Sequence, residues 1–288
     1  MYAVTGITGQ VGAAVARSLL SADQAVRAVV RDRAKGAAWA ALGCEVAVAD
    51  LSDAAALAAA FEGTQGVFAM LPPVFDPAPG FREARAFIEV LREALARAKP
   101  AKVVALSTIG ADAPQPNLLN ALGLMENALK SLPLPVAFLR AAWFMENAAW
   151  DIAAARDGVI PSYLQPLDRA VPMIATDDVG RTAAALLLEQ WQGQRVVELE
   201  GPRRVSPNAL AEAFAKALGQ AVRTEAVPRE RWESIFRGQG MKNPEPRMQM
   251  IDGFSAGWID FADRGVNARK GAIDIDQAIA TLIQRERA

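Results

Sequence analysis

The residues with the clearest chemical meaning are three glycines near the start of the chain, Gly6, Gly9 and Gly12. They follow the short apolar run 2–4 and precede residues 11–19, whose apolar positions recur at helical spacing. A strand, a glycine turn and a helix N-terminus form the unit that binds a dinucleotide pyrophosphate, and N–H groups at the helix start supply the anion site. Gly6 permits the tight turn, Gly9 lets the backbone approach the phosphates, and Gly12 lets helix and strand pack closely. The spacing G-x-x-G-x-x-G is one residue longer than G-x-G-x-x-G, and any tight turn favours glycine, but the strand and helix context favours a cofactor site.

Basic residues after the second expected strand indicate which dinucleotide binds. An NAD site usually has Asp or Glu about 20 residues past the glycines, on the ribose 2′-OH. This chain has Arg31 in that region and Lys35 one helical turn on, which suits the 2′-phosphate of NADP. Two alternatives stay open: the basic residues form a solvated loop, or a small shift of the strand end presents Asp32 to NAD.

Acidic residues at the ends of other elements each allow two interpretations. Asp50, followed by Leu51, closes the third expected strand, where a carboxylate can accept a hydrogen bond from the adenine amino group. The alternative is a helix N-cap role that Asp50 shares with Ser52. Asp177 and Asp178 precede an alanine-rich helix; paired carboxylates can do acid–base chemistry, but the helix dipole favours negative charge in a first turn, so we predict capping.

Absent residue types exclude several kinds of chemistry. The 288 residues contain no histidine, and Cys44 is the only cysteine. Catalytic Ser-His-Asp and Cys-His pairs, imidazole bases and His-containing metal sites are therefore excluded, as are a multi-cysteine cluster and an intramolecular disulfide. Carboxylate-based or cofactor-based chemistry remains, and we predict no metal site.

Charge and hydropathy exclude other classes of partner. The formal net charge is −1, so no global basic field attracts nucleic acid or a membrane surface. The longest apolar runs are far below the roughly 18 residues of a membrane span. Because the first expected strand begins at Met1, we expect no signal or transit peptide and a cytoplasmic location.

Apolar runs alternate with helical segments through the first half of the chain, which predicts an α/β fold with a Rossmann-type, doubly wound parallel sheet. Further strands are expected at 26–30, 45–49, 66–71, 102–106 and 136–139, and a helix at 81–98. After about residue 150 the alternation loosens, and the segment from Val205 onward is mostly helical. We therefore expect a dinucleotide-binding domain at 1–150 and a smaller substrate or partner lobe at 151–288, packed over the cofactor cleft with a diffuse boundary.

Several motifs together resemble the NmrA-like atypical short-chain dehydrogenase/reductases, nearest to the type 2 NAD(P)H:quinone oxidoreductases and the triphenylmethane reductases. The resemblance runs from Met1 to about Arg181 and thins out afterwards. It implies a Rossmann domain, a small C-terminal substrate lobe and a preference for NADP(H). The motifs that carry it are TGITGQVG, an Arg after the second strand, AVADLSD, ALSTIGA, LRAAWFMEN and VPMIATDDVGRTAA.

The resemblance also implies roles for individual residues along a bound cofactor. The expected contacts are Thr8, Gln10 and Val11 on the phosphates, Arg31 on the 2′-phosphate, Leu71 and Pro72 on the adenosine side, Ser107 and Thr108 near the nicotinamide ribose, and Trp143, Phe144 and Asn147 at the nicotinamide end.

The chain departs from its relatives in the groups that could protonate a substrate. Classical short-chain enzymes use Tyr-x-x-x-Lys, but Tyr2 and Tyr163 are followed four residues on by Gly6 and Leu167. Many members of the family carry His or Lys before the sixth strand, where this chain offers only Asn120. We therefore expect reduction only where hydride transfer needs no strong protein acid.

Two functions from different classes follow from these residues. The first is an NADPH-dependent reductase of a flat acceptor such as a quinone; the second is a cofactor-binding regulator that acts through a protein partner. An open, aromatic-lined nicotinamide face favours the enzyme, and a face plugged by side chains favours the regulator. Aromatic residues that could roof the site, each of which could instead belong to the core, are Phe75, Trp143, Phe254 and Trp258.

Overall fold

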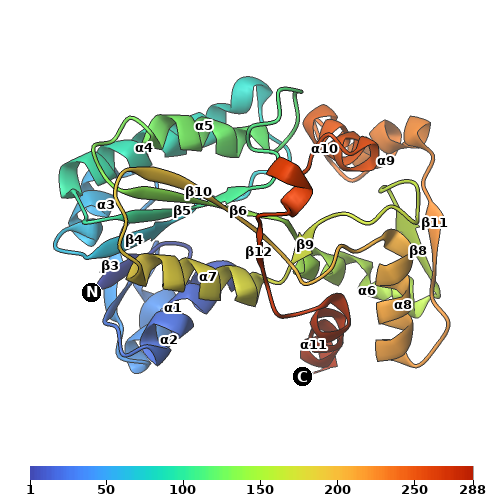
Figure 1. The fold of residues 1–288 in the computed structure, drawn as a ribbon, viewed down its shortest axis with the longest axis horizontal. Helices are drawn as coiled ribbons and strands as arrows, with labels where there is room; N and C mark the ends of the chain where they lie inside the picture. The colour runs from blue at the N-terminus through green and yellow to red at the C-terminus, as the bar shows by residue number, and fades with distance from the viewer. Residues whose placement is uncertain (288) are drawn as a thin grey trace.

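A parallel sheet of eight strands runs through the centre of the computed structural model, which describes residues 1–287 (Figure 1). The strand order is β12-β10-β6-β5-β4-β1-β2-β3, and every pairing in this sheet is parallel. The predicted doubly wound sheet is confirmed. Its strands are β1 Tyr2–Val4, β2 Val26–Val30, β3 Glu45–Val48, β4 Gly66–Ala69, β5 Val103–Thr108, β6 Val136–Ala141, β10 Gln194–Glu200 and β12 Arg269–Lys270.

The second half of the chain contributes more to this sheet than the sequence pattern indicates. β10 pairs with β6 over its length, with Val196 opposite Phe138, and β12 adds a short edge. The chain after residue 150 therefore supplies both sheet strands and a smaller lobe. The division at residue 150 stays a prediction.

Alternate residues of the buried strands pack against helices on opposite faces of the sheet. In β5, Val104 and Leu106 belong to the core beneath one face, and Val103 and Ala105 to the core beneath the other. Figure 1 shows the two helical layers. One layer contains α1 Gln10–Ser21, α2 Ala37–Ala41 and α7 Thr176–Leu188; the other contains α3 Ala54–Phe61, α4 Arg82–Ala98 and α5 Asn120–Leu129.

The smaller lobe lies to the right in Figure 1 and has an apolar core of its own. Trp232, Phe236 and Ile251 are buried in that core. The lobe is mostly helical, as predicted, with short parallel strand pairs added. Its elements are α6 Ile152–Arg156, β8 Val159–Ser162 paired with β11 Arg223–Ala226, α8 Pro207–Leu218, α9 Trp232–Gly238, α10 Glu245–Ala256 and α11 Ile275–Arg287, together with β7 Trp143–Phe144 paired with β9 Met173–Ile174.

The strand order reverses between β1 and β4, and in open α/β sheets ligands bind beyond the carboxyl ends of the strands at such a point. Thr5 joins the two strand ends. Its hydroxyl donates to the carbonyl of Phe68 at 3.2 Å and accepts from the N–H of Met70 at 3.2 Å.

Residues 1–287 contain neither a helix that could span a membrane nor a cluster of metal-binding side chains. Among their helices, none is both long and apolar enough to cross a membrane. Nor does any group of three or more Cys, Asp or Glu side chains in that range have an arrangement that could hold a metal ion.

Candidate cofactor and substrate site

The glycine turn leaves the start of α1 open to a ligand. Gly9 is the N-cap of α1, and no side chain caps the helix. Gly6 has a φ of +62°, which favours glycine, and its carbonyl accepts a hydrogen bond from the Gly9 N–H at 2.9 Å. A Cβ on Gly12 would lie 2.3 Å from the Gly6 carbonyl oxygen, so only glycine fits there. Because Gly6, Thr8, Gly9 and Gln10 are exposed, the turn and the helix start fit a diphosphate.

Val11 and Gln10 were both predicted on the phosphates, but their side chains differ in exposure. Val11 is only 4% exposed and packs into the core, so its side chain faces away from the turn. Gln10 is exposed, and its side-chain oxygen accepts from the Thr176 hydroxyl at 3.4 Å. The start of α7 therefore lies beside the start of α1.

A small apolar cavity adjoins the switch point on the side of β3 and β4. It brings together Leu71 and Pro72, the residues predicted on the adenosine side, with Leu51, Thr5 and Met70. Its remaining lining comes from α3 and α4, namely Leu57, Phe87 and Leu91.

Asp50 lies at the end of β3 and stabilises a turn there. Its carboxylate accepts hydrogen bonds from the Ser52 hydroxyl at 2.6 Å and the Ser52 N–H at 2.8 Å, and these bonds lower the pKa of the carboxyl. The N-cap of α3 is Asp53, which accepts from the N–H groups of Ala55 and Ala56. The alternative N-cap role of Asp50 is therefore wrong, because the helix begins one turn later.

Basic side chains project from the turn after β2. Arg31 and Lys35 are exposed and form no ion pair within the described chain. Arg31 and Asp50 follow neighbouring strand ends, because Val30 of β2 pairs with Val48 of β3. The charge of Arg31 adds to the Ser52 hydrogen bonds in lowering the pKa of Asp50. Asp32 accepts from the Ala34 N–H at 2.9 Å and caps the short helix Arg33–Gly36. One oxygen of Asp32 is thus occupied by the protein itself.

The two polar residues at the end of β5 differ in how far they are buried. Ser107 is 3% exposed, and its hydroxyl donates to Glu126 at 2.6 Å, whereas Thr108 is half-buried. Thr108 is therefore the more open of the pair.

Glu126 belongs to a buried ion-pair network that the sequence analysis missed. Arg140 of β6 donates to both oxygens of Glu126, at 2.8 and 2.7 Å, and to Asp112 at 2.6 Å. Burial opposes the charge on Arg140, but Glu126 and Asp112 outweigh it and raise the pKa of the guanidinium. The signal for this pair was a Glu and an Arg within otherwise apolar segments.

The segment after β6 carries the residues predicted at the nicotinamide end. Trp143, Phe144 and Asn147 are all half-buried. Glu146 accepts from the Thr176 N–H with both oxygens at 3.0 Å, so it caps α7, and its burial raises the pKa of its carboxyl. The Asn147 amide has no hydrogen-bond partner within residues 1–287, which leaves it available to a ligand.

The acidic pair at the start of α7 has structural contacts. α7 begins at Thr176, so Asp177 and Asp178 both lie in its first turn, as the capping prediction requires. Asp178 is buried and accepts from the N–H groups of Ala272 and Ile273 at 3.0 and 2.9 Å. It therefore fixes the segment before α11 as well.

Three of the aromatic residues predicted to roof the site lie in two separate aromatic pairs. Trp143 packs edge-on against Phe254, with ring centroids 5.1 Å apart, and Phe75 packs edge-on against Trp150 at 5.8 Å. Phe254 is 2% exposed, so it belongs to the core, whereas Phe75 and Trp150 are exposed by 49% and 64%. Trp258 is half-buried. Trp150 was not predicted here, because one exposed aromatic residue carries no periodic signal.

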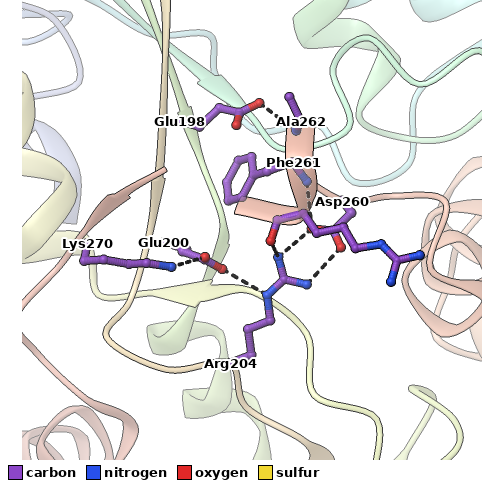
Figure 2. Close-up of polar contacts among 8 residues, drawn as sticks. Glu198, Glu200, Arg204, Asp260, Phe261, Ala262 and Lys270 are labelled. Atoms are coloured by element: carbon purple, nitrogen blue, oxygen red, sulfur yellow. Dashed lines mark hydrogen bonds and ion pairs between the residues drawn. The ribbon is translucent and has the colours of Figure 1, made fainter. Parts of the chain in front are cut away.

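An ion-pair network anchors the segment that reaches the loop after β5 (Figure 2). Arg204 donates to both oxygens of Asp260, at 2.8 and 2.7 Å, and to the buried Glu200 at 3.2 Å. Glu200 also pairs with Lys270 of β12. Ile259 packs against Gly110, two residues past the end of β5, so this network holds the segment that carries Ile259 against that loop.

A pair of hydrogen bonds joins the loop after β4 to the loop between α9 and α10. The carboxylate of Asp76 accepts from the N–H groups of Lys242 and Asn243 at 2.8 and 2.7 Å. These bonds connect the smaller lobe to the sheet domain beside the exposed Phe75.

A model of the NmrA-like family matches residues 2–255. The chain belongs to the NmrA-like family. The resemblance in the motifs is confirmed, and the match extends well beyond Arg181, where the sequence similarity was expected to thin out.

Known proteins of similar sequence and fold include several reductases. An NAD(P)H azoreductase from Xenophilus azovorans is 28% identical over 84% of this chain and 82% of its own. Quinone oxidoreductase 2 from Escherichia coli (strain K12) is 28% identical over 98% of this chain and 93% of its own. A solved structure of the Escherichia coli NADPH-dependent quinone oxidoreductase with NADPH has a TM-score of 0.81 at 24% identity, covering 98% of this chain and all of that chain. A triphenylmethane reductase from Citrobacter sp. has a TM-score of 0.81 at 21% identity, covering 98% of this chain and 99% of its own.

Proposed function

We propose that this protein is an NADPH-dependent oxidoreductase that reduces a planar, electron-poor acceptor such as a quinone. The observation that carries the proposal is the uncapped start of α1 at the sheet's switch point, with the unpaired Arg31 at the end of the neighbouring strand. Relatives named as azo-compound and quinone reductases, and a structural neighbour solved with NADPH, support the same activity.

The residues of this chain would hold the cofactor along the carboxyl edge of the sheet. The turn Gly6–Gly12 would bind the diphosphate, and Arg31 with Lys35 the 2′-phosphate. The apolar side chains of Leu51, Leu71 and Pro72 would pack against the adenine. Thr108 and Asn147 would contact the nicotinamide end. When bound, NADPH supplies the hydride.

The chain itself contributes position and exclusion of water rather than a strong acid. No Tyr-x-x-x-Lys pair is present in the sequence, and a quinone can take its protons from solvent. The half-buried Trp143 and Phe144 suit a flat acceptor, and their partial exposure supports an enzyme over a regulator with a plugged face.

The direct test is NADPH oxidation with a panel of quinones, azo and triphenylmethane dyes and enones. We expect turnover of at least one planar acceptor, with NADPH preferred over NADH. Binding of NADPH without turnover of any acceptor above the protein-free rate would overturn the proposal and favour a regulator.

A further inference from the structure

Arg247 on α10 differs from the other buried or half-buried arginines of residues 1–286 because it has no carboxylate partner. Arg247 is half-buried. Within residues 1–286, every other arginine side chain that is buried or half-buried forms an ion pair. These pairs are Arg27–Glu45, Arg92–Glu89, Arg140–Glu126, Arg195–Glu189 and Arg204–Asp260.

The Arg247 guanidinium packs on apolar groups, and a tyrosine packs on the same aromatic ring. The central carbon of the guanidinium lies 4.7 Å from the centre of the Phe236 ring, and a nitrogen lies 3.8 Å from the Met241 sulfur. Tyr163 packs on the same Phe236 ring at 5.0 Å, and its hydroxyl has no partner in the described chain. Burial lowers the pKa of Arg247, whereas Tyr163 is the titratable neighbour that opposes this effect. A desolvated charge without a counter-ion is costly, so this arrangement favours an anionic ligand.

The helix geometry places this guanidinium near the proposed acceptor site. Arg247 and Phe254 are seven residues apart on α10, which puts them on the same face about 10 Å apart along the axis. Phe254 contacts Trp143, the first residue of β7, which was predicted at the nicotinamide end. Burial raises the pKa of Tyr163, and the nearby charge of Asp151 adds to this effect.

We propose that Arg247 is a specificity-determining residue that binds a carboxylate or sulfonate group on the planar acceptor. Two parallel N–H groups of the guanidinium hold two oxygens of the anion, and the Tyr163 hydroxyl donates a further hydrogen bond. Phe236 keeps the guanidinium plane in place from behind. This inference deepens the proposed function and rests on it for the position of the acceptor.

The test is calorimetric titration of two probes that cannot be reduced, 2-naphthalenesulfonate and 2-naphthol, into protein with excess NADP⁺. Wild type should bind the sulfonate more tightly than the naphthol. Arg247→Met should weaken sulfonate binding about ten- to hundredfold and change naphthol binding less than twofold. Arg247→Lys keeps the charge without the planar fork and should lose less.

The matched control is Arg229→Met. Arg229 also lies over a ring of the smaller lobe, 4.7 Å from Trp232, but it is paired with Asp252 at 2.8 Å. This variant should bind both probes as wild type does. Equal binding of the two probes by wild type, or equal losses in the Arg247 and Arg229 variants, would overturn the anion site. Because neither probe is reduced, the titration is independent of turnover. Selective sulfonate binding, together with no oxidation of NADPH by any acceptor of the panel, would overturn the proposed function and leave the anion site standing.

Discussion

At the scale of single residues, we expect the exposed Arg31 to set the choice between NADPH and NADH. Losing a charge-assisted hydrogen-bond pair costs about 1.5–3 kcal/mol, which is roughly ten- to hundredfold in affinity. Arg31→Ala should weaken NADPH binding by that factor and leave NADH binding nearly unchanged. Lys35→Ala should act in the same direction but less, because a flexible ammonium makes a looser contact.

Calorimetric titration of both cofactors into these variants checks the Arg31 prediction. Arg33→Ala is the control, because Arg33 is exposed in the same turn. A wild-type preference for NADH, or equal weakening of both cofactors by Arg31→Ala, would show that Asp32 binds the ribose instead.

Asp151 gives a residue-scale prediction about pH. Burial raises the pKa of its carboxyl from 3.8 to about 6. A raised pKa contributes stability that is present below about pH 4 and is lost as the pH rises through 6. At pH 8, the free energy of unfolding of Asp151→Asn, measured with urea, should therefore exceed that of wild type by about 1–3 kcal/mol. This difference should shrink towards pH 4. The exposed Asp157→Asn is the control, and a difference for Asp151→Asn that stays constant with pH would contradict the assignment.

At the scale of elements, the buried pair of Glu126 and Arg140 joins α5 to β6. Removing one partner of a buried pair leaves an uncompensated charge, which costs about 3–5 kcal/mol. Glu126→Ala should lower the free energy of unfolding by that amount, whereas Glu89→Ala, which breaks the surface pair with Arg92, should change it by less than about 1 kcal/mol. Urea unfolding of both variants is the measurement, and equal effects would show that the pair contributes little.

The elements show how far sequence periodicity predicts this fold. The strands of the first half could be predicted to within about two residues, because buried parallel strands are continuous apolar runs between helices. β10 and β12 could not be assigned to the sheet, since pairing between distant segments leaves no local pattern. In β12 the paired residues are the exposed Arg269 and Lys270, which do not resemble a strand of the core.

Which residues lie together at the candidate site could be predicted where local motifs position the backbone, and their roles toward a cofactor stay predictions. The glycine turn and the cavity of Leu51, Leu71 and Pro72 follow from neighbouring strand ends. Other features could not be predicted, because each depends on contacts between segments far apart in the chain. They are the hydrogen bonds to Asp76, the ion-pair network of Glu126, and the packing of Trp150 on Phe75.

At the scale of the whole molecule, Asp76 connects the smaller lobe to the sheet domain. Asp76→Ala removes the acceptor for two backbone N–H groups, so trypsin should cleave after Lys242 faster than in wild type. The exposed Glu62→Ala serves as the control. An unchanged cleavage rate would show that other contacts suffice to hold the loop.

The most direct test of the central claim is an anaerobic single turnover of protein-bound NADPH with 1,4-naphthoquinone, followed by the nicotinamide absorbance. The experiment is repeated with NADPH deuterated at either face of C4. We predict that the absorbance falls faster than without protein. We also predict that the decay is slowed by deuterium on one of the two faces and is unchanged by deuterium on the other. An absorbance that falls no faster than in the protein-free mixture, or that is slowed equally by deuterium on either face, would contradict the account.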